Sequence, residues 1–332
     1  MKKGSVLTRA TGFAIAALAC LALGAPAPAA AQAPAKLKIV VFGFPSLGAF
    51  MPPVIKAKKF DTANGLDITF DERPPTAYTT QFNSGEYQLG GSAALLTVGL
   101  ADLRGVKVKY LFNLFDFWGG VVTSRPAVKT VKDLEGKELA AARATTNFQM
   151  FDFFAKKLGA DTAKIKVVNT APPGLVGYAM ADRADAVQLW EPAYTLLKAK
   201  KPDIRLLDLQ LEKTWKTFAG GTQIPYLGVA AHTGWIKEHE ALIPKLYAAY
   251  KAAGEFIVQH PEEAAKLIEP KGTAADQAAL VSLIKSNERL GMNVMGAHDL
   301  KKQIDAVYKA GMDVGYLKSM PSNDTIYDKP LK

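Results

Sequence analysis

The stretch LKIVVFGFPSLGAFMPPVIKAKKFDTANGLDITF, residues 37–70, contains the pattern that decides the fold. It begins with a short apolar, β-prone run that ends at a glycine, and it predicts a helix over 51–59. A second strand is predicted over 65–70, entered through a turn at an Asn-Gly pair. Short strands separated by a helix require a crossover connection, so the stretch predicts neighbouring parallel strands in an α/β domain.

The alternation of strands and helices continues to about residue 231, and long helices follow it. Further strands are predicted over 106–112, 121–123, 138–142, 164–168, 184–189 and 204–207, with an extended piece over 223–231. Helices are predicted over 76–83, 93–100, 145–158, 174–181, 244–258, 261–268, 274–290 and 299–310, and another begins at Pro192. The length of 332 residues suits two domains better than one.

We expect a chain that starts one lobe, builds a second lobe and then returns to complete the first. The two crossings are placed near 120–125 and 226–230. The first lobe would comprise 36–122 and 230–332, and the second lobe 123–229. Each lobe is expected to be a mostly parallel sheet flanked by helices.

The N-terminal segment has the three parts of a secretory signal peptide. Lys2 and Lys3 give it a basic start, an apolar run without charge follows over 13–23, and small residues come next. The apolar run is too short to span a bilayer comfortably. The pattern therefore predicts cleavage after Ala31, which removes residues 1–31 and leaves a periplasmic protein.

Cys20 is the only cysteine of the chain, and it lies inside this segment. The alternative interpretation is a lipoprotein anchored through Cys20. It is less favoured because Ala17 stands three residues before the cysteine, where such signals usually carry leucine. Without the signal peptide the chain has no cysteine, and therefore no disulfide, thiol nucleophile or cysteine-ligated metal.

Charge and motif content argue against several function classes. The net charge is +10, but arginine-rich runs, zinc-finger spacings and ribonucleoprotein motifs are missing from the sequence. We therefore expect a solvated basic surface that attracts anionic ligands, and no nucleic-acid partner. The four histidines have no metal-ligand spacing, and residues 90–94 lack the second glycine of a nucleophile elbow. The sequence predicts neither an enzyme nor a bound metal or cofactor.

Three loops rich in hydrogen-bond donors are predicted to face a cleft. In open α/β sheets ligands lie beyond the carboxyl ends of strands, where helix N-termini present free N–H groups. Such loops could bind a carboxylate, a sulfonate or a similar oxyanion, although each residue could equally be a helix cap. The candidates are Thr145, Thr146 and Asn147 at a helix start, Ser92 after two glycines, Phe44 and Ser46 after the first strand, and Thr76.

Aromatic residues near the first crossing indicate that the ligand has an apolar or aromatic body. Phe117 and Trp118 precede two glycines there, and Phe44 and Trp190 follow strands. Packing in the core is the alternative for these rings. Glu191, at a strand end, could bind an N–H of the ligand, pair across the lobes when they close, or be an exposed charge at a helix start.

The chain resembles the nitrate/sulfonate/taurine type of substrate-binding protein of ABC importers over residues 36–318. The Asp-Leu-x-Gly-Lys turn followed about fifty residues later by Trp-Glu-Pro is the most specific part of the pattern. The matching segments are Phe60 with Gly65-Leu66-Asp67, Phe82-Asn83-Ser84-Gly85, Val131-Lys132-Asp133-Leu134-Glu135-Gly136-Lys137, Thr145-Thr146-Asn147, Ala184-Asp185-Ala186 and Trp190-Glu191-Pro192.

The resemblance implies a periplasmic-binding-protein type II clamp with two hinge crossings, which closes on its ligand. It also implies an ABC permease and an ATPase of the inner membrane as partners of a monomeric protein. Two departures fall in the first lobe. Lys58-Lys59-Phe60 stands where relatives often have a Lys-Gly-x-Phe stretch, and Gln88 stands where they often have aspartate.

Several ligands remain open at this point. A small organic anion with an apolar body, a sulfonate or a carboxylate, is our main expectation. Nitrate, taurine or a thiamine-pyrimidine precursor would suit the same scaffold, and so would a sensory role that reports the ligand to a membrane partner. A related fold, the thiamine-pyrimidine synthase, depends on a cysteine-rich motif that this chain lacks.

Overall fold

Two β-sheets organise the chain into two lobes. The computed structural model describes Met1 and residues 33–332, so the predicted signal peptide, its cleavage after Ala31 and the alternative anchor at Cys20 lie outside the described residues. The first lobe has a six-stranded sheet in the order β11-β4-β10-β3-β1-β2, and the second has a five-stranded sheet in the order β7-β6-β8-β5-β9. The predicted two-lobe α/β fold is therefore confirmed.

The strands of the first sheet are β1 (Ala35–Phe42), β2 (Leu66–Arg73), β3 (Leu89–Ala94), β4 (Val108–Asp116), β10 (Pro225–His232) and β11 (Met292–Gly296). Those of the second sheet are β5 (Gly119–Thr123), β6 (Glu138–Ala141), β7 (Lys166–Asn169), β8 (Ala186–Trp190) and β9 (Arg205–Leu206).

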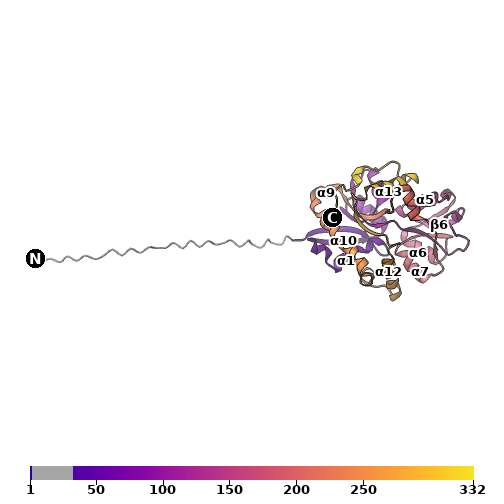
Figure 1. Ribbon diagram of the computed structural model, residues 1–332, viewed down its shortest axis with the longest axis horizontal. Helices are drawn as coiled ribbons and strands as arrows, with labels where there is room; N and C mark the ends of the chain where they lie inside the picture. Colours follow the sequence, from indigo (N-terminus) through magenta and orange to yellow (C-terminus); the bar gives the residue numbers. More distant parts are fainter. Residues whose placement is uncertain (2–32) are drawn as a thin grey trace. The chain divides into compact units, whose positions relative to one another are not determined.

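Helices cover the sheets of both lobes. The first lobe carries α1 (Met51–Ala57), α2 (Phe60–Ala63), α3 (Pro75–Asn83), α4 (Leu95–Leu103), α9 (Thr233–His239), α10 (Ile243–Gln259), α11 (Pro261–Ile268), α12 (Ala274–Ser286) and α13 (Lys301–Asp313). The second carries α5 (Thr146–Lys157), α6 (Pro172–Met180) and α7 (Ala193–Lys200), and α8 (Leu211–Ala219) lies on the return path. Within residues 33–332, α5, β6, α6 and α7 gather at one end and α1, α9 and α10 at the other (Figure 1). None of the helices in the described part is both long and apolar enough to cross a membrane.

The strand–helix–strand stretch at 37–70 folds as predicted. β1 and β2 pair in parallel, with Ala35 opposite Leu66 and Phe42 opposite Arg73. The alternating side chains Leu66 and Ile68 of β2 are buried, because one face of this edge strand is covered and the other is solvated.

Both sheets are mixed, and most strands of each run in one direction, as predicted: β1, β2, β3 and β4 in the first sheet, and β6, β7, β8 and β9 in the second. β10 runs antiparallel to β3 and β4, β11 runs antiparallel to β4, and β5 runs antiparallel to β8 and β9. Strands β5 and β10 are the first strands after the two crossings. A chain that arrives from the other lobe enters the sheet at the end where the neighbouring strands finish, so it runs antiparallel to them. The direction of these strands is therefore fixed by the crossings and not by local periodicity.

Three local predictions need correction. Residues 90–92 lie inside strand β3 and do not open a helix. Helix α12 ends at Ser286 because Asn287 takes up a left-handed conformation with φ of 49°, so 287–290 form a loop. Strand β11 and helix α8 were not predicted.

The chain crosses between the lobes at 117–118 and again at 207–224, the segment that contains α8. All of β5 belongs to the second sheet and all of β10 to the first. The predicted boundaries, 122/123 and 229/230, divide these two strands instead. Both runs are apolar throughout, so periodicity does not show which sheet they join.

The tight packing of side chains against Gly91 in β3 leads to a prediction about stability. A Cβ added at Gly91 would lie 2.8 Å from Tyr250 Oη and 2.9 Å from Val41 Cγ1, so Gly91→Ala should lower the free energy of unfolding by about 1–3 kcal/mol. Gly177 in α6 has no atom within 4 Å of the same position, so Gly177→Ala should be neutral or stabilising by up to about 1 kcal/mol. Urea unfolding measures both, and equal midpoints for the two variants would contradict the packing argument.

Candidate ligand cleft

The N-terminus of α5 reaches the interface between the lobes. Thr145 caps the helix: its Oγ1 accepts from Phe148 N at 3.2 Å and donates to Ala142 O at 2.7 Å. The next two residues, Thr146 and Asn147, are buried, and their backbone N–H groups precede the first intrahelical hydrogen bonds. The helix start predicted from the sequence is therefore present, and it combines two donor groups with the positive end of the helix dipole.

First-lobe residues contact this helix start directly. Thr97 Oγ1 lies 3.5 Å from Thr146 Oγ1, and Asn147 Nδ2 donates to Tyr226 Oη at 2.8 Å. Asn147 Oδ1 is buried and has no hydrogen-bond partner within the described chain. Burying an acceptor without a partner is costly, so this atom has an unused capacity to accept a hydrogen bond from a ligand or a water.

The other predicted donor residues lie in the first lobe, where the hydroxyl oxygens of Ser92 and Ser46 accept hydrogen bonds from backbone N–H groups. Ser92 is buried in β3, and its Oγ accepts from Phe42 N at 2.9 Å. Ser46 Oγ accepts from Gly48 N at 3.2 Å and caps a short 3₁₀ turn. Thr76 is exposed in the first turn of α3, and Phe44 is half-buried against the first-lobe core. The structure brings Ser92 and the loop after β1 together, but it does not bring Thr76 to the helix start of α5.

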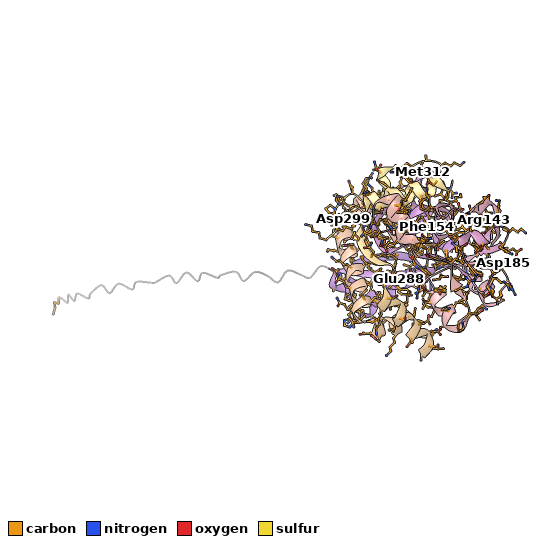
Figure 2. All side chains as sticks on the ribbon, turned by 45° about the vertical axis from the view of Figure 1, so that its right-hand side comes forward. Arg143, Phe154, Asp185, Glu288, Asp299 and Met312 are labelled. Atoms are coloured by element: carbon orange, nitrogen blue, oxygen red, sulfur yellow. The ribbon has the colours of Figure 1, made fainter. Side chains whose placement is uncertain are left out.

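A large hollow of about 1110 Å³ lies at the two crossings. The aromatic residues predicted at the first crossing, Phe117 and Trp118, line it, whereas the other predicted ligand residues do not. Trp190 ends β8, opposite Gly119, and packs on the second-lobe core. In Figure 2, Glu288 of the lining lies between Asp299 of the first lobe and Asp185 of the second. The lining comprises Asp116, Phe117, Trp118, Gly119, Gly120, Leu206, Leu207, Asp208, Leu209, Gln210, Leu211, Glu212, Lys213, Lys216, Thr222, Ile224, Glu288, Arg289 and Gly291.

An ion pair between the lobes borders this hollow. Arg289 Nε donates to Glu191 Oε1 at 2.8 Å, and Thr195 N donates to Glu191 Oε2 at 3.1 Å. Glu191 is fully buried, and burial raises the pKa of its carboxyl, against the lowering effect of Arg289. Of the three roles considered for Glu191, the structure shows pairing across the lobes.

The guanidinium of Arg289 also packs on two aromatic rings of the second lobe and its crossing. It lies 6.0 Å from the ring centroid of Trp118 and 5.7 Å from that of Tyr194. Nη1 of Arg289 donates no hydrogen bond to any described residue, so its N–H groups are free to donate to another molecule. The sequence did not single out Arg289, because 274–290 was predicted as one continuous helix. The Asn287 and Gly291 that flank the loop are the only local signal for it.

An acidic residue, Asp116, ends β4 in the wall of the hollow. Asn113 Nδ2 donates to its Oδ1 at 3.1 Å, and Asn293 Nδ2 donates to its Oδ2 at 3.0 Å. Burial raises the pKa of this carboxyl to about 7, and hydrogen bonds from Asn293, Asn113 and the backbone of Ile224 only partly oppose the effect. Asp116 was not predicted as a site residue, because its burial depends on strands that are distant in the sequence.

Clusters of three or more His, Cys, Asp or Glu side chains that could hold a metal ion are not found in residues 33–332. The hollow is lined by aromatic side chains and by three basic side chains, those of Arg289, Lys213 and Lys216.

Known proteins resemble this chain in sequence family and in fold. A family model described as NMT1/THI5 like matches residues 54–264, and no curated protein sequence matches the chain.

The alkanesulfonate-binding protein SsuA from Xanthomonas axonopodis pv. citri, bound to MOPS, has a TM-score of 0.72 at 16% identity, covering 89% of this chain and 99% of that one. The periplasmic aliphatic sulphonate-binding protein SsuA from Escherichia coli has a TM-score of 0.70 at 16% identity, covering 90% and 94%. A ligand-binding component of an ABC-type import system from Staphylococcus aureus, with zinc bound, has a TM-score of 0.66 at 9% identity, covering 89% and 97%.

The buried ion pair between the lobes generates a second stability prediction. Arg289→Met leaves Glu191 buried without its partner, which should cost about 3–5 kcal/mol at pH 8. The loss should become smaller as the pH is lowered, because burial raises the pKa of Glu191 and the unpaired carboxyl is relieved by taking up a proton. Urea unfolding of Arg289→Met and of the double variant with Glu191→Gln measures the effect. The double variant should recover most of the loss, and a double variant no better than the single one would contradict this account.

Proposed function

The chain belongs to the NMT1/THI5-like family, and from this premise we propose that it is the substrate-binding subunit of an ABC importer. In this proposal it is a binding protein and not an enzyme. It holds a small organic anion with an apolar or aromatic body in the cleft between its lobes.

The observation that carries the proposal is Arg289 in the wall of the hollow. Its guanidinium lies against Trp118 and Tyr194, and it has donors to spare. A fixed cation beside aromatic faces suits a ligand with an anionic group on an apolar body. The ring of Phe117 extends the apolar wall of the same hollow. A volume of about 1110 Å³ exceeds what nitrate alone needs, so we favour an organic anion.

The helix start of α5 supplies a second place for anionic oxygens. The first N–H groups of α5, at Thr146 and Asn147, lie where the two lobes meet. Two solved relatives are sulfonate-binding proteins, which supports a sulfonate as the anionic group over a carboxylate. We further propose that the protein acts as a periplasmic monomer that delivers its ligand to a permease and an ATPase of the inner membrane.

One observation favours a second ligand class. Asn147 Oδ1 is a buried acceptor without a partner in the described chain, and an amine of a pyrimidine-type ligand could donate to it. Pyrimidine amines therefore belong in the same binding screen as the anions.

The first prediction from this function concerns thermal stabilisation by ligand. We expect alkane- and arylsulfonates or aromatic carboxylates to raise the melting temperature of the protein, because a ligand that binds only the native state stabilises it by about 2.7 kcal/mol at a hundredfold excess over Kd. The screen compares them with nitrate, taurine and pyrimidine amines in phosphate buffer, since sulfonate buffers are potential ligands. A shift with pyrimidine amines alone would replace the anion by the second ligand class, and turnover of any compound would contradict the assignment as a binding protein.

The second prediction locates the ligand. Trp118→Ala and Arg289→Lys should each weaken binding of an arylsulfonate at least tenfold, roughly the loss of one aromatic or forked charge-assisted contact. Arg183→Gln is the matched control, because Arg183 is exposed and does not line the hollow. Isothermal titration gives the affinities, and thermal melts without ligand confirm that each variant is folded. Unchanged affinity in both cleft variants would place the ligand elsewhere.

A further inference from the structure

Asp116 is an acidic side chain in the wall of the hollow for which the proposed function gives no role. Its oxygens accept from the amides of Asn113 and Asn293, at 3.1 and 3.0 Å. No ion pair within the described part of the chain includes Asp116. An anion site therefore contains a carboxyl that has amide donors but no cation to compensate a negative charge.

The backbone places Asp116 close to the residues that would hold the anion. Asp116 N donates to Gly291 O at 2.6 Å, so the end of β4 lies against the segment that precedes β11. Trp118 follows Asp116 by two residues and Arg289 precedes Gly291 by two residues. The guanidinium of Arg289 lies 6.0 Å from the ring centroid of Trp118. Gly291 has no side chain to cover this wall, and all four residues line the same hollow.

A negative carboxylate in this position opposes a bound anion. Two like charges in a poorly hydrated site disfavour each other, and the usual relief is that one of them takes up a proton. Burial already raises the pKa of Asp116 to about 7, so the proton is available near neutral pH. In its neutral form the carboxyl becomes a hydrogen-bond donor, which a sulfonate or carboxylate oxygen can accept.

We propose that Asp116 binds the anionic ligand in its protonated form and donates its O–H to an oxygen of the ligand. Each anion that binds at alkaline pH, where free Asp116 is ionised, then brings about one proton from solvent, and this proton stays on Asp116. The inference rests on the proposed function, because it requires an anion in the hollow.

The other charged groups around the hollow differ from Asp116 in their surroundings. Tyr110, packed behind Asp116, has a pKa that burial raises well above its usual range, so it stays neutral. Glu191, behind Arg289, is the other buried carboxyl with a raised pKa, and it serves as the control. No histidine lines the hollow within the described chain. The remaining charged residues of the lining are Arg289 and the solvent-exposed Asp208, Glu212, Lys213, Lys216 and Glu288.

Isothermal titration with benzenesulfonate tests the proposal on the full chain. This probe stays ionised between pH 6 and 8, so any proton taken up on binding goes to the protein. Titrations in phosphate, imidazole and Tris buffers, which differ in ionisation enthalpy, give the number of protons bound. We expect about one proton per ligand at pH 8 and only a small fraction at pH 6, with affinity falling roughly tenfold per pH unit above 7.

Two variants test whether Asp116 is the group that takes up the proton. Asp116→Asn keeps an amide donor and should bind benzenesulfonate without proton uptake and with an affinity that does not change between pH 6 and 8. Glu191→Gln should retain the proton uptake. Binding to the unaltered protein without proton uptake would overturn the inference, whatever the stability of the variants, and so would uptake that persists in Asp116→Asn. If no aromatic or aliphatic anion binds, the proposed function itself is overturned. The two failures can be told apart, because only the failure of the inference still shows a heat of binding.

Discussion

The cleft depends on the hydrogen bonds of one buried side chain, that of Asn113. Its Oδ1 accepts from Tyr110 Oη at 2.8 Å and from Tyr226 N at 3.1 Å. Its Nδ2 donates to Asp116 Oδ1 at 3.1 Å and to Asn293 O at 2.9 Å. One amide, fully buried, thus uses its whole hydrogen-bonding capacity to join β4 to β10 and β11. Because a buried amide is costly unless it is satisfied, these strands are held in one arrangement at the point where the chain leaves the first sheet.

The position of the crossings follows from this arrangement. Phe117 N donates to Ile224 O at 2.7 Å, so the outgoing and returning segments are bonded to each other before they separate. The next residue, Trp118, lines the hollow, and its ring contacts the guanidinium of Arg289 from the first lobe. The aromatic and cationic parts of the proposed site, Trp118 and Arg289, therefore come from distant segments of the sequence and depend on the same few backbone contacts.

The two lobes are joined by apolar packing as well as by polar contacts. One hydrophobic cluster extends from Ile39 and Phe115 of the first lobe to Leu139 and Phe154 of the second, and a smaller separate core lies around Leu175 and Leu189. Ion pairs also join the lobes, Arg289 with Glu191 and Lys200 with Asp276, the latter at 2.9 Å. Polar contacts can be exchanged for water when lobes separate, whereas apolar contacts are lost at a cost.

The sequence by itself determined the elements and the fold class. Apolar periodicity located most strands and helices, the stretch at 37–70 predicted its parallel pair, and the helix start at Thr145 was visible from its capping residues. Family-specific segments indicated the two-lobe clamp. These features are local, because backbone propensity and the burial of one face are written in residues that lie close together in the chain.

Only the tertiary structure decided strand direction and the partners of buried polar groups. Ser92 was predicted as a ligand donor from its local sequence alone, and only the structure shows that its hydroxyl oxygen accepts from Phe42 N, fifty residues away. Glu191 is paired with Arg289 across 98 residues, and Asp116 becomes unusual only because strands from distant segments remove it from water. The charge and hydrogen-bonding state of such a group depends on which distant segment packs against it, and local sequence does not contain that information.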